Sequence, residues 1–339
     1  MPLVSVIVPC YNEQATIRLL LEAIRGQTFC QGAGANGDLE VVIADGRSTD
    51  RTREEVAAFQ RENPGLPVTL VDNPRRDIPA GLNCAISAAR GEYIIRLDAH
   101  SVPSPDYVAR CVAALAAHQG ENVGGVWEIR PQRDGLMPRA IAIAAAHPFG
   151  VGDARYRYTT QASYVDTVPF GAFRRDTFDQ YGMFDETLLT NEDYEYNARL
   201  RKAGGRIWLD PRIRSTYFAR PNLKALATQY WRYGYWKWRM LRRYPQTLRW
   251  RQGLPPVFVM SLFVLLLLSL AWGVARLLAG MEIAAYILVL MAGALPAVRR
   301  SGDPRMIVAV PLAIATMHLF WGAGFLWSVV SSRPASLSS

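Results

Sequence analysis

The stretch LVSVIVPCYNE, residues 3–13, is an apolar, β-branched run that ends abruptly in polar residues. Apolar residues then recur at positions 17, 20, 21 and 24, which is the spacing of one helix face. The alternation continues, with strands predicted at 40–45, 68–71, 93–98 and 123–129 and helices predicted after Asp50, at 79–89 and at 105–117. Because strands that alternate with helices build a mostly parallel, doubly wound sheet covered on both faces, we predict an α/β fold.

Polar side chains follow these strands at the points where the strands end. Tyr11 and Glu13 come after the first strand, Asp45 ends the second, and Asp98 with His100 ends the fourth. Ligands of such sheets bind outside the carboxyl ends of the strands. We therefore expect these side chains to face one crevice.

The sequence lacks two common phosphate-binding motifs, so an anion at that crevice would have to be bound in another way. A Walker A motif and a G-x-G-x-x-G motif are both missing after the first strand, which disfavours a P-loop NTPase and a Rossmann dehydrogenase. Asp98 and His100 stand two positions apart on a chain leaving a strand, so both can converge on one divalent cation, Mg²⁺ or Mn²⁺. Such a cation would hold a diphosphate.

A second acidic group lies in TNEDYEYNA, residues 190–198, which opens a helix that ends near Gly204. Glu192 and Asp193 fall in its first turn, where the helix dipole favours negative charge. They either cap the helix or supply a general base for an acceptor hydroxyl.

The C-terminal part of the chain reads as a membrane region. Spans are predicted at 254–278, which is uncharged as far as residue 275, and at 306–330, because each reaches the ~20 residues that cross a bilayer. The run at 283–298 has only 16 residues, so it is a weaker third span or a re-entrant segment. A buried helical hairpin of a soluble domain is the alternative. His318 within the last span is either functional or, as we prefer, packed in neutral form.

Positive charge sets the expected orientation. Eight Lys and Arg residues and no acidic ones lie at 224–251, and Arg299, Arg300 and Arg305 separate the last two runs. With three spans, the positive-inside rule places a domain of residues 1–220 in the cytosol of a bacterial inner-membrane protein and the C-terminus on the opposite side. Four widely spaced cysteines fit a reduced compartment and neither a disulfide framework nor a zinc site.

Residues 221–253 mix those cations with many Trp and Tyr residues. Such a mixture can stack single-stranded nucleic acid, and it is also typical of an interfacial membrane helix. Because the segment runs directly into the first predicted span at the start of 254–330, we expect a lipid bilayer as its partner and no nucleic acid.

Six short motifs in order resemble the family-2 glycosyltransferases with the GT-A fold, over about residues 3–250. They are PCYNE (9–13), ADGRSTD (44–50), RLDAHS (96–101), GAFRR (171–175), NED (191–193) and QYWRYG (229–234). The chain looks most similar to bacterial exopolysaccharide enzymes of the succinoglycan type, which also carry C-terminal membrane helices.

The resemblance implies a nucleotide-sugar site formed by Pro9, Tyr11, Glu13, Asp45 and Asp98. Asp45 matches the acid that reads the nucleotide base, which favours a UDP donor. Asp98 matches the first acid of the family's metal motif.

The resemblance also departs from the family pattern in two places. His100 stands where the family has its second metal acid, which puts metal dependence in question, although histidine is a competent ligand. Asp193 matches the catalytic base, with Glu192 beside it. Gln229 and Arg232 resemble the start of a Q-x-x-R-W motif at an acceptor or membrane interface, but Tyr233 replaces the tryptophan.

The implied activity is an inverting, metal-dependent transfer of a sugar, with glucose as first choice, from a UDP-sugar. The expected acceptor is a polyprenyl-linked or oligosaccharide chain in exopolysaccharide or cell-surface glycan synthesis, with other exopolysaccharide assembly proteins as further partners. Two alternatives stay open: a processive membrane polysaccharide synthase, and a non-enzymatic, membrane-anchored module that binds anions.

Overall fold

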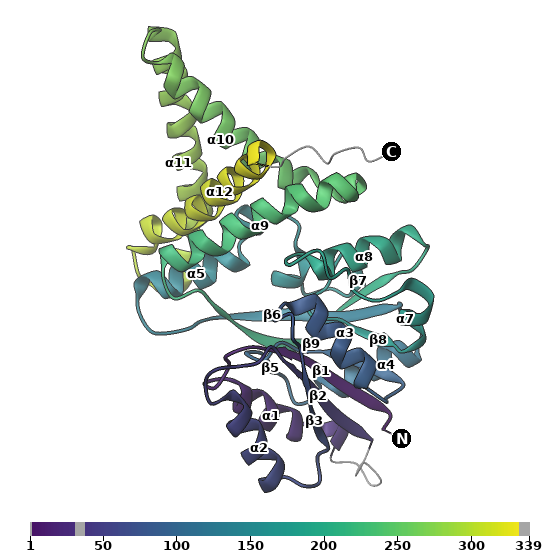
Figure 1. Ribbon diagram of the computed structural model, residues 1–339. Helices are drawn as coiled ribbons and strands as arrows, with labels where there is room; N and C mark the ends of the chain where they lie inside the picture. The colour runs from purple at the N-terminus through teal and green to yellow at the C-terminus, as the bar shows by residue number, and fades with distance from the viewer. Residues whose placement is uncertain (1, 31–37, 332–339) are drawn as a thin grey trace, which may run out of the picture. The chain divides into compact units, whose positions relative to one another are not determined.

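The computed structural model describes residues 2–30 and 38–331 of the chain (Figure 1). It divides into two compact units, one formed by residues 1–128 and 158–217 and the other by residues 129–157 and 218–339. The N-terminal domain expected at 1–220 therefore ends close to the chain position where the first unit ends. Residues 129–157, however, group with the C-terminal helices.

The first unit is built on a mixed sheet. Within the described residues this sheet has nine strands, with β7 (Ser163–Tyr164) pairing to β9 outside the main order. The main order is β3 (Val68–Asp72), β2 (Leu39–Asp45), β1 (Val4–Cys10), β4 (Tyr93–Arg96), β8 (Ala172–Arg174), β6 (Asn122–Pro131), β9 (Ile207–Ala219) and β5 (Val102–Pro103).

The parallel part of the sheet is the part predicted from the alternating pattern. β1 pairs in parallel with both β2 and β4, and β2 pairs in parallel with β3. β6, the fifth predicted strand, instead pairs antiparallel with β8, which is itself antiparallel to β4. β6 thus runs in the same direction as β4, but a three-residue strand from much later in the chain lies between them.

Helices complete the first unit. They are α1 (Ile17–Arg25), α2 (Thr52–Glu62), α3 (Ile78–Ala88), α4 (Tyr107–Ala116), α7 (Asp176–Tyr181) and α8 (Glu192–Lys202), with a 3₁₀ turn at Thr28–Cys30. Asp77 caps α3, because its Oδ1 accepts the Ala80 N–H at 2.9 Å and Pro79 stands in the first turn.

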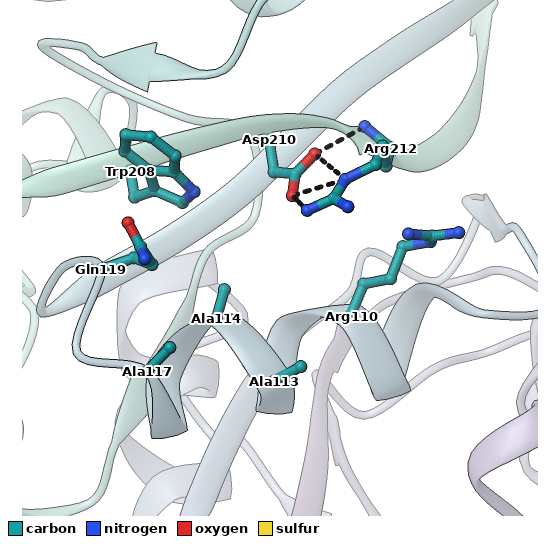
Figure 2. A pocket seen from close by; sticks show the side chains of 8 residues that line it. All are labelled: Arg110, Ala113, Ala114, Ala117, Gln119, Trp208, Asp210 and Arg212. Carbon is teal, nitrogen blue, oxygen red and sulfur yellow. Dashed lines mark hydrogen bonds and ion pairs between the residues drawn. The ribbon is translucent and has the colours of Figure 1, made fainter.

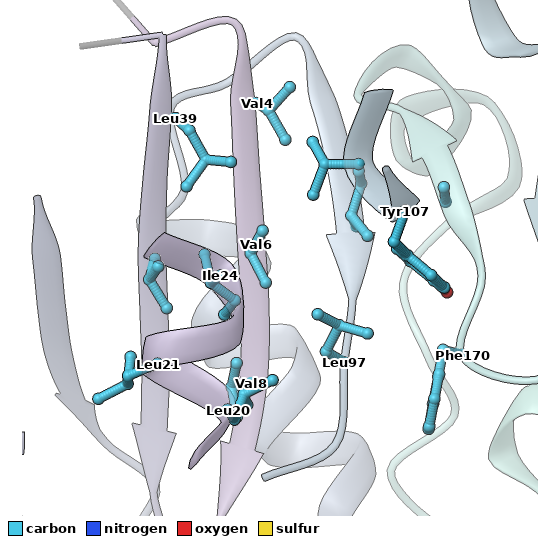
Figure 3. Close-up of a cluster of buried hydrophobic side chains, with 14 of the residues drawn as sticks. Val4, Val6, Val8, Leu20, Leu21, Ile24, Leu39, Leu97, Tyr107 and Phe170 are labelled. Carbon is cyan, nitrogen blue, oxygen red and sulfur yellow. The ribbon is translucent and has the colours of Figure 1, made fainter. Parts of the chain in front are cut away.

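The main core lies on one face of the central strands (Figure 3). Val4, Val6 and Val8 alternate along β1 toward Leu20 and Ile24 of α1, and all five are fully buried. The other faces of the strands are also buried, with Ile7 and Ile94 inaccessible to solvent. Burial on both faces is what parallel strands require, and it brings their carboxyl ends to one edge.

The second unit is helical. It contains α5 (Leu136–Ala146), α6 (Pro148–Val151), α9 (Leu223–Arg243), α10 (Trp250–Leu268), α11 (Gly273–Ser301) and α12 (Met306–Ser331), with 3₁₀ turns at Arg155–Arg157 and Pro245–Thr247. Three of these helices, α10, α11 and α12, are long and apolar enough to cross a membrane.

Two of the predicted spans have different bounds in the structure. The first helix ends at Leu268, before the expected end at 278, and the 16-residue run at 283–298 lies inside the 29-residue α11. The difference arises because Arg276 and Glu282, whose charges suggest a loop between two spans, are both helical. Glu282 is accommodated by a 2.5 Å hydrogen bond from Ser261 Oγ of α10 to its Oε1.

Candidate functional site

The loops that follow β1 and β2 are fastened to each other. The Asn12 N–H donates to Ser48 Oγ at 2.8 Å, and the Thr49 N–H donates to Asn12 Oδ1 at 2.8 Å. The Glu13 N–H donates to Thr52 Oγ1 at 2.8 Å. Two of the predicted strand-end segments therefore form one continuous edge.

Several residues along this edge adopt a left-handed backbone conformation. Asn12 has φ 54°, Arg47 58° and Arg76 61°, and Asn191, directly before α8, has φ 69°. Such conformations are costly for residues other than glycine and concentrate at functional sites. They occur in the loops after β1, β2 and β3 and at the start of α8.

Asp45 is fully buried at the end of β2. Its carboxylate accepts the Ser48 hydroxyl at 2.6 Å and Arg53 Nε at 2.6 Å. Arg53 also forms an ion pair with Asp72 at the end of β3. The predicted base-reading acid is thus held in one orientation by an arginine that the sequence did not single out.

Tyr11 and Pro9, both predicted to bind the nucleotide sugar, occupy different environments. Tyr11 is 44% exposed, and its ring leaves no spare room at Gly46, where an added Cβ would lie 3.2 Å from it. Pro9 packs toward α3, where a Cβ added to Gly81 would lie 3.4 Å from the Cβ of Pro9. Tyr11 can therefore contact a ligand at the edge, whereas Pro9 shapes the strand behind it.

Glu13 and His100 come together although 87 positions separate them. Glu13 Oε1 lies 3.0 Å from His100 Nδ1, and the His100 side chain is half-exposed. A carboxylate next to one imidazole nitrogen orients the ring and makes the other nitrogen a better metal ligand.

The donor set at the edge fits a hard cation that is held largely by phosphate oxygens. Groups of three or more His, Cys, Asp or Glu side chains poised to hold a metal are not found among the described residues. Asp98 and His100 would supply two ligands, and Mg²⁺ commonly binds through one or two carboxylates together with substrate phosphates.

The centre of the site is a buried arginine, Arg96, at the end of β4. Its Nη2 lies 3.2 Å from Asp98 Oδ1 and 3.1 Å from Glu192 Oε1, and its Nε donates to the same Asp98 oxygen at 3.2 Å. The side chains of Arg96 and Glu192 are each only 6% exposed. One guanidinium therefore joins the predicted metal acid to the predicted catalytic pair.

Burial changes the acidity of that pair. It raises the pKa of Glu192 to about 7, although Arg96 opposes the shift, and the neighbouring Asp193 adds to it. Burial likewise raises the pKa of Asp193, again against Arg96. Both carboxyls therefore take up a proton nearer to neutral pH than exposed acids do, as suits acid–base chemistry.

A buried polar network holds the helix that carries the pair. Asn197 of α8 accepts the Asn122 side-chain amide at 2.6 Å and donates to Thr167 Oγ1 at 3.0 Å. Tyr194 donates its hydroxyl to Asp166 Oδ2 at 3.1 Å. These bonds fix the first two turns of α8 on the sheet.

Sequence reasoning missed Arg96 and Arg53. A signal for Arg96 was present, because it stands between Ile95 and Leu97 in a strand expected to be buried on both faces, and arginine is almost never fully buried unless paired. Arg53 gave no such signal, because it lies on an ordinary helix turn.

The predicted interface residues Gln229, Arg232 and Tyr233 lie on α9 of the second unit. Gln229 Nε2 donates to Tyr233 Oη at 2.9 Å, one turn away, while Arg232 is exposed. The partial motif thus forms a local pair on one side of α9.

A shallow cavity of about 270 Å³ lies elsewhere in the first unit, between α4 and β9 (Figure 2). Ala113 and Trp208 line it together with Asp210, whose carboxylate accepts Arg212 Nη2 at 2.7 Å. It contains none of the predicted site residues, and its acid is already paired with Arg212, so we assign it no role.

Comparison with known proteins identifies relatives along the whole chain. The family model described as glycosyl transferase family 2 matches residues 5–182. The succinoglycan biosynthesis protein ExoA of Rhizobium meliloti is 31% identical over 330 residues, covering 97% of this chain and 95% of that protein.

Two more distant proteins are similar over nearly the same length. A dolichyl N-acetyl-α-D-glucosaminyl phosphate 3-β-D-2,3-diacetamido-2,3-dideoxy-β-D-glucuronosyltransferase of Methanococcus voltae is 23% identical, covering 98% of this chain and 99% of that protein. Among solved structures, a Pyrobaculum calidifontis mannosyltransferase in complex with GDP-Man and Mn²⁺ superposes with a TM-score of 0.63 at 22% identity, covering 98% of this chain and 88% of that one. The likeness to this structure confirms the predicted fold.

Proposed function

This chain belongs to glycosyltransferase family 2, and from that premise we propose that it transfers a sugar, with inversion, from a UDP-sugar to a lipid-linked saccharide at the cytosolic face of a bacterial inner membrane. The observation that carries the proposal is the Arg96 bridge between Asp98 and Glu192. It joins a candidate donor-binding acid and a candidate acid–base pair in one buried cluster.

The geometry supports different roles for the two acids of α8. Glu192 is held against Arg96 and is almost inaccessible, so it acts as a positioning residue. Asp193 is less buried than Glu192, keeps part of its surface exposed and accepts the Tyr194 N–H at 2.7 Å with Oδ1, so an acceptor can reach it. Asp193 is therefore the better candidate for the general base.

The proposed reaction is a single displacement. The acceptor hydroxyl oxygen attacks the anomeric carbon and passes its proton to the Asp193 carboxylate, while the bond from that carbon to the diphosphate oxygen breaks. The diphosphate leaves as an anion. General-base assistance of this kind is worth about 10²–10⁴-fold in rate.

The remaining strand-end residues would hold the donor. Asp45, whose carboxylate is fully buried and held by Arg53, would favour uracil by fixing the loop after β2, and Tyr11 would contact the nucleoside from the exposed side of the loop. Asp98 and His100 would hold a divalent cation, which when bound neutralises charge on the leaving diphosphate. Two features support an exopolysaccharide or surface-glycan product: the sequence similarity to a succinoglycan biosynthesis protein and the three apolar helices.

The test is a transfer assay with the full chain in detergent, with UDP-sugars and GDP-sugars as donors and a polyprenyl-linked saccharide as acceptor. We expect transfer from a UDP-sugar and its loss in excess chelator. In Asp193→Asn, we expect turnover to fall by about 10²–10⁴-fold while the donor still protects the protein against thermal unfolding.

Asp176→Asn is the matched control, because Asp176 is 71% exposed on α7 and should leave turnover unchanged. Equal loss of donor protection and turnover in Asp193→Asn would make Asp193 a structural residue. Transfer from GDP-sugars alone would contradict the role given to Asp45, and full activity in chelator would contradict the cation site.

A further inference from the structure

The second unit contains a polar layer that marks one level along its apolar helices. Asp153 forms an ion pair with Arg251 near the start of α10, and His147 Nε2 lies 3.1 Å from the Gly293 carbonyl oxygen of α11. The short segment 147–153 thus touches α10 and α11 at the same height. Charged and polar groups of this kind lie at a membrane boundary and not in the hydrocarbon.

Beyond this layer, α10 and α11 continue as an apolar hairpin (Figure 1). Phe258 stacks on Tyr286 with ring centroids 4.3 Å apart, which pairs the two helices in antiparallel register. At a rise of ~1.5 Å per residue, the 17 residues from Gly293 back to Arg276 near the tip extend about 25 Å. The hairpin is long enough to carry Arg276 to the opposite boundary.

The middle of α12 lies between the polar layer and a level about two turns along the hairpin, where His318 Nδ1 is 2.9 Å from Tyr286 Oη of α11. His318 Nε2 is 2.7 Å from the Phe149 carbonyl oxygen, and a Cβ on Gly150 would lie 2.9 Å from Met317 Cε. Gly322 packs against Pro255 and Val259, four and eight residues from Arg251, which are distances of about 6 and 12 Å along the helix axis. A helix that crosses the bilayer has its middle at the centre of the hydrocarbon, about 15 Å from either boundary.

Helix α12 also runs alongside α9 in the opposite direction (Figure 1). A Cβ on Gly234 would overlap the Trp321 carbonyl, and a Cβ on Gly324 would overlap that of Trp231, so the two backbones touch at paired glycines. Because α9 and α12 are antiparallel, the C-terminal end of α12 lies near the N-terminal end of α9.

The charge on α9 excludes it from the hydrocarbon. It carries six Lys and Arg residues and no acidic ones, and charged side chains are strongly disfavoured at the bilayer centre. A partner that lies side by side with α9 over most of its length shares its depth. Both ends of α12 also lie on the side of the membrane that faces the first unit. Arg299, Arg300 and Arg305 precede its N-terminal end, and its C-terminal end lies near the start of α9, which begins four residues after β9 ends.

We propose that only the α10–α11 hairpin crosses the bilayer, and that α12 lies flat in the interface between α9 and the acyl chains. The C-terminal end of α12, at Ser331, then lies on the same side of the membrane as the N-terminal domain, opposite to the side expected for three spans. The partner of this surface is the lipid headgroup boundary, with α9 supplying cations and α12 the apolar face. The inference rests on the membrane association of these helices and not on the transfer reaction.

The experiment is cysteine labelling in intact spheroplasts of cells that express the full chain, using a membrane-impermeant maleimide with and without detergent, with each labelled thiol assigned to its position by peptide mapping. Native Cys84, half-buried in the first unit, reports the side of that unit. Leu270→Cys places a thiol at the hairpin tip, where Leu270 is 84% exposed, and Ser338→Cys places one near the C-terminus.

We expect Leu270→Cys to be labelled equally with and without detergent, and both Cys84 and Ser338→Cys to be labelled only after detergent. Ser301→Cys, at the end of α11, is the matched control and should follow Cys84. Labelling of Ser338→Cys in intact spheroplasts would show that α12 crosses and overturn the proposal. Protection of Leu270→Cys in intact spheroplasts would overturn it as well. Neither outcome depends on transferase activity.

Discussion

Replacing Arg96 with methionine tests whether the buried bridge holds the site together. Methionine keeps much of the side-chain volume but removes the cation that lies within 3.2 Å of both Asp98 and Glu192. Three carboxylates, those of Asp98, Glu192 and Asp193, then remain in a space that contained one balancing guanidinium.

The expected loss of stability follows from burial. Removing one partner of a buried ion pair costs about 3–5 kcal/mol, because the other charge is left without compensation. Arg96 and Glu192 are each 6% exposed, so this range applies to them. Exposed pairs contribute only about 0–1 kcal/mol. A domain is stable by about 5–15 kcal/mol, so Arg96→Met should remove a third or more of that margin in many such domains.

The assay is urea unfolding of the full chain in detergent, followed by a signal from the α/β domain. The matched control is Arg214→Met, because Arg214 pairs with Glu128 at 3.3 Å with side chains 55% and 37% exposed. We expect a large fall in the midpoint for Arg96→Met and almost none for the control. Adding Glu192→Gln to Arg96→Met should recover part of the loss, because one uncompensated carboxylate disappears. Equal midpoints for the two arginine variants, or no recovery in the double variant, would refute the bridge as the organising contact.

Two further predictions concern protonation and helix packing. The pKa of Glu192 is about 7 in the folded state and 4.5 for an ordinary glutamate, so between these pH values the native state binds more protons than the unfolded state. The free energy of unfolding should therefore fall as pH rises from about 4.5 to about 7. Glu192→Gln should flatten that slope in unfolding curves recorded at several pH values. Gly234→Leu should lower the thermal unfolding midpoint in detergent, because the larger side chain forces α9 away from α12 at a cost of about 1–3 kcal/mol. Gly280→Leu is the control, because the space around its Cβ position is open, and it should leave the midpoint unchanged. Similar midpoints for both variants would mean that the glycine contact is dispensable.

The parallel half of the fold was readable from the sequence because its strands are long, apolar and followed by helices of regular spacing. β1, β2, β3 and β4 appear within a few residues of the predicted bounds. β7 and β8 have two and three residues, which is too short for any periodic signal. Their positions depend on pairing with strands far away in the chain.

Segment 129–157 shows a different limit of sequence reasoning. Its helix α5 has 11 residues, which is too short to suggest a membrane element, and it is rich in alanine and isoleucine like any buried helix. Its place in the second unit becomes visible only through contacts of its neighbours, such as His147 with Gly293. Local composition cannot report which of two apolar cores a short helix joins.

The structure gives a physical reason for the histidine at position 100, where the family pattern has an acidic residue. A carboxylate at this position would face Glu13, whose Oε1 is 3.0 Å from the His100 ring, and like charges at that distance disfavour each other strongly. The site already carries Asp98, Glu192 and Asp193 against a single buried arginine. In the proposed cation site, histidine at position 100 would supply a ligand atom without adding a negative charge beside Glu13, which orients its ring. The histidine and the glutamate are therefore best understood as one unit, in which either residue alone would be a poorer choice.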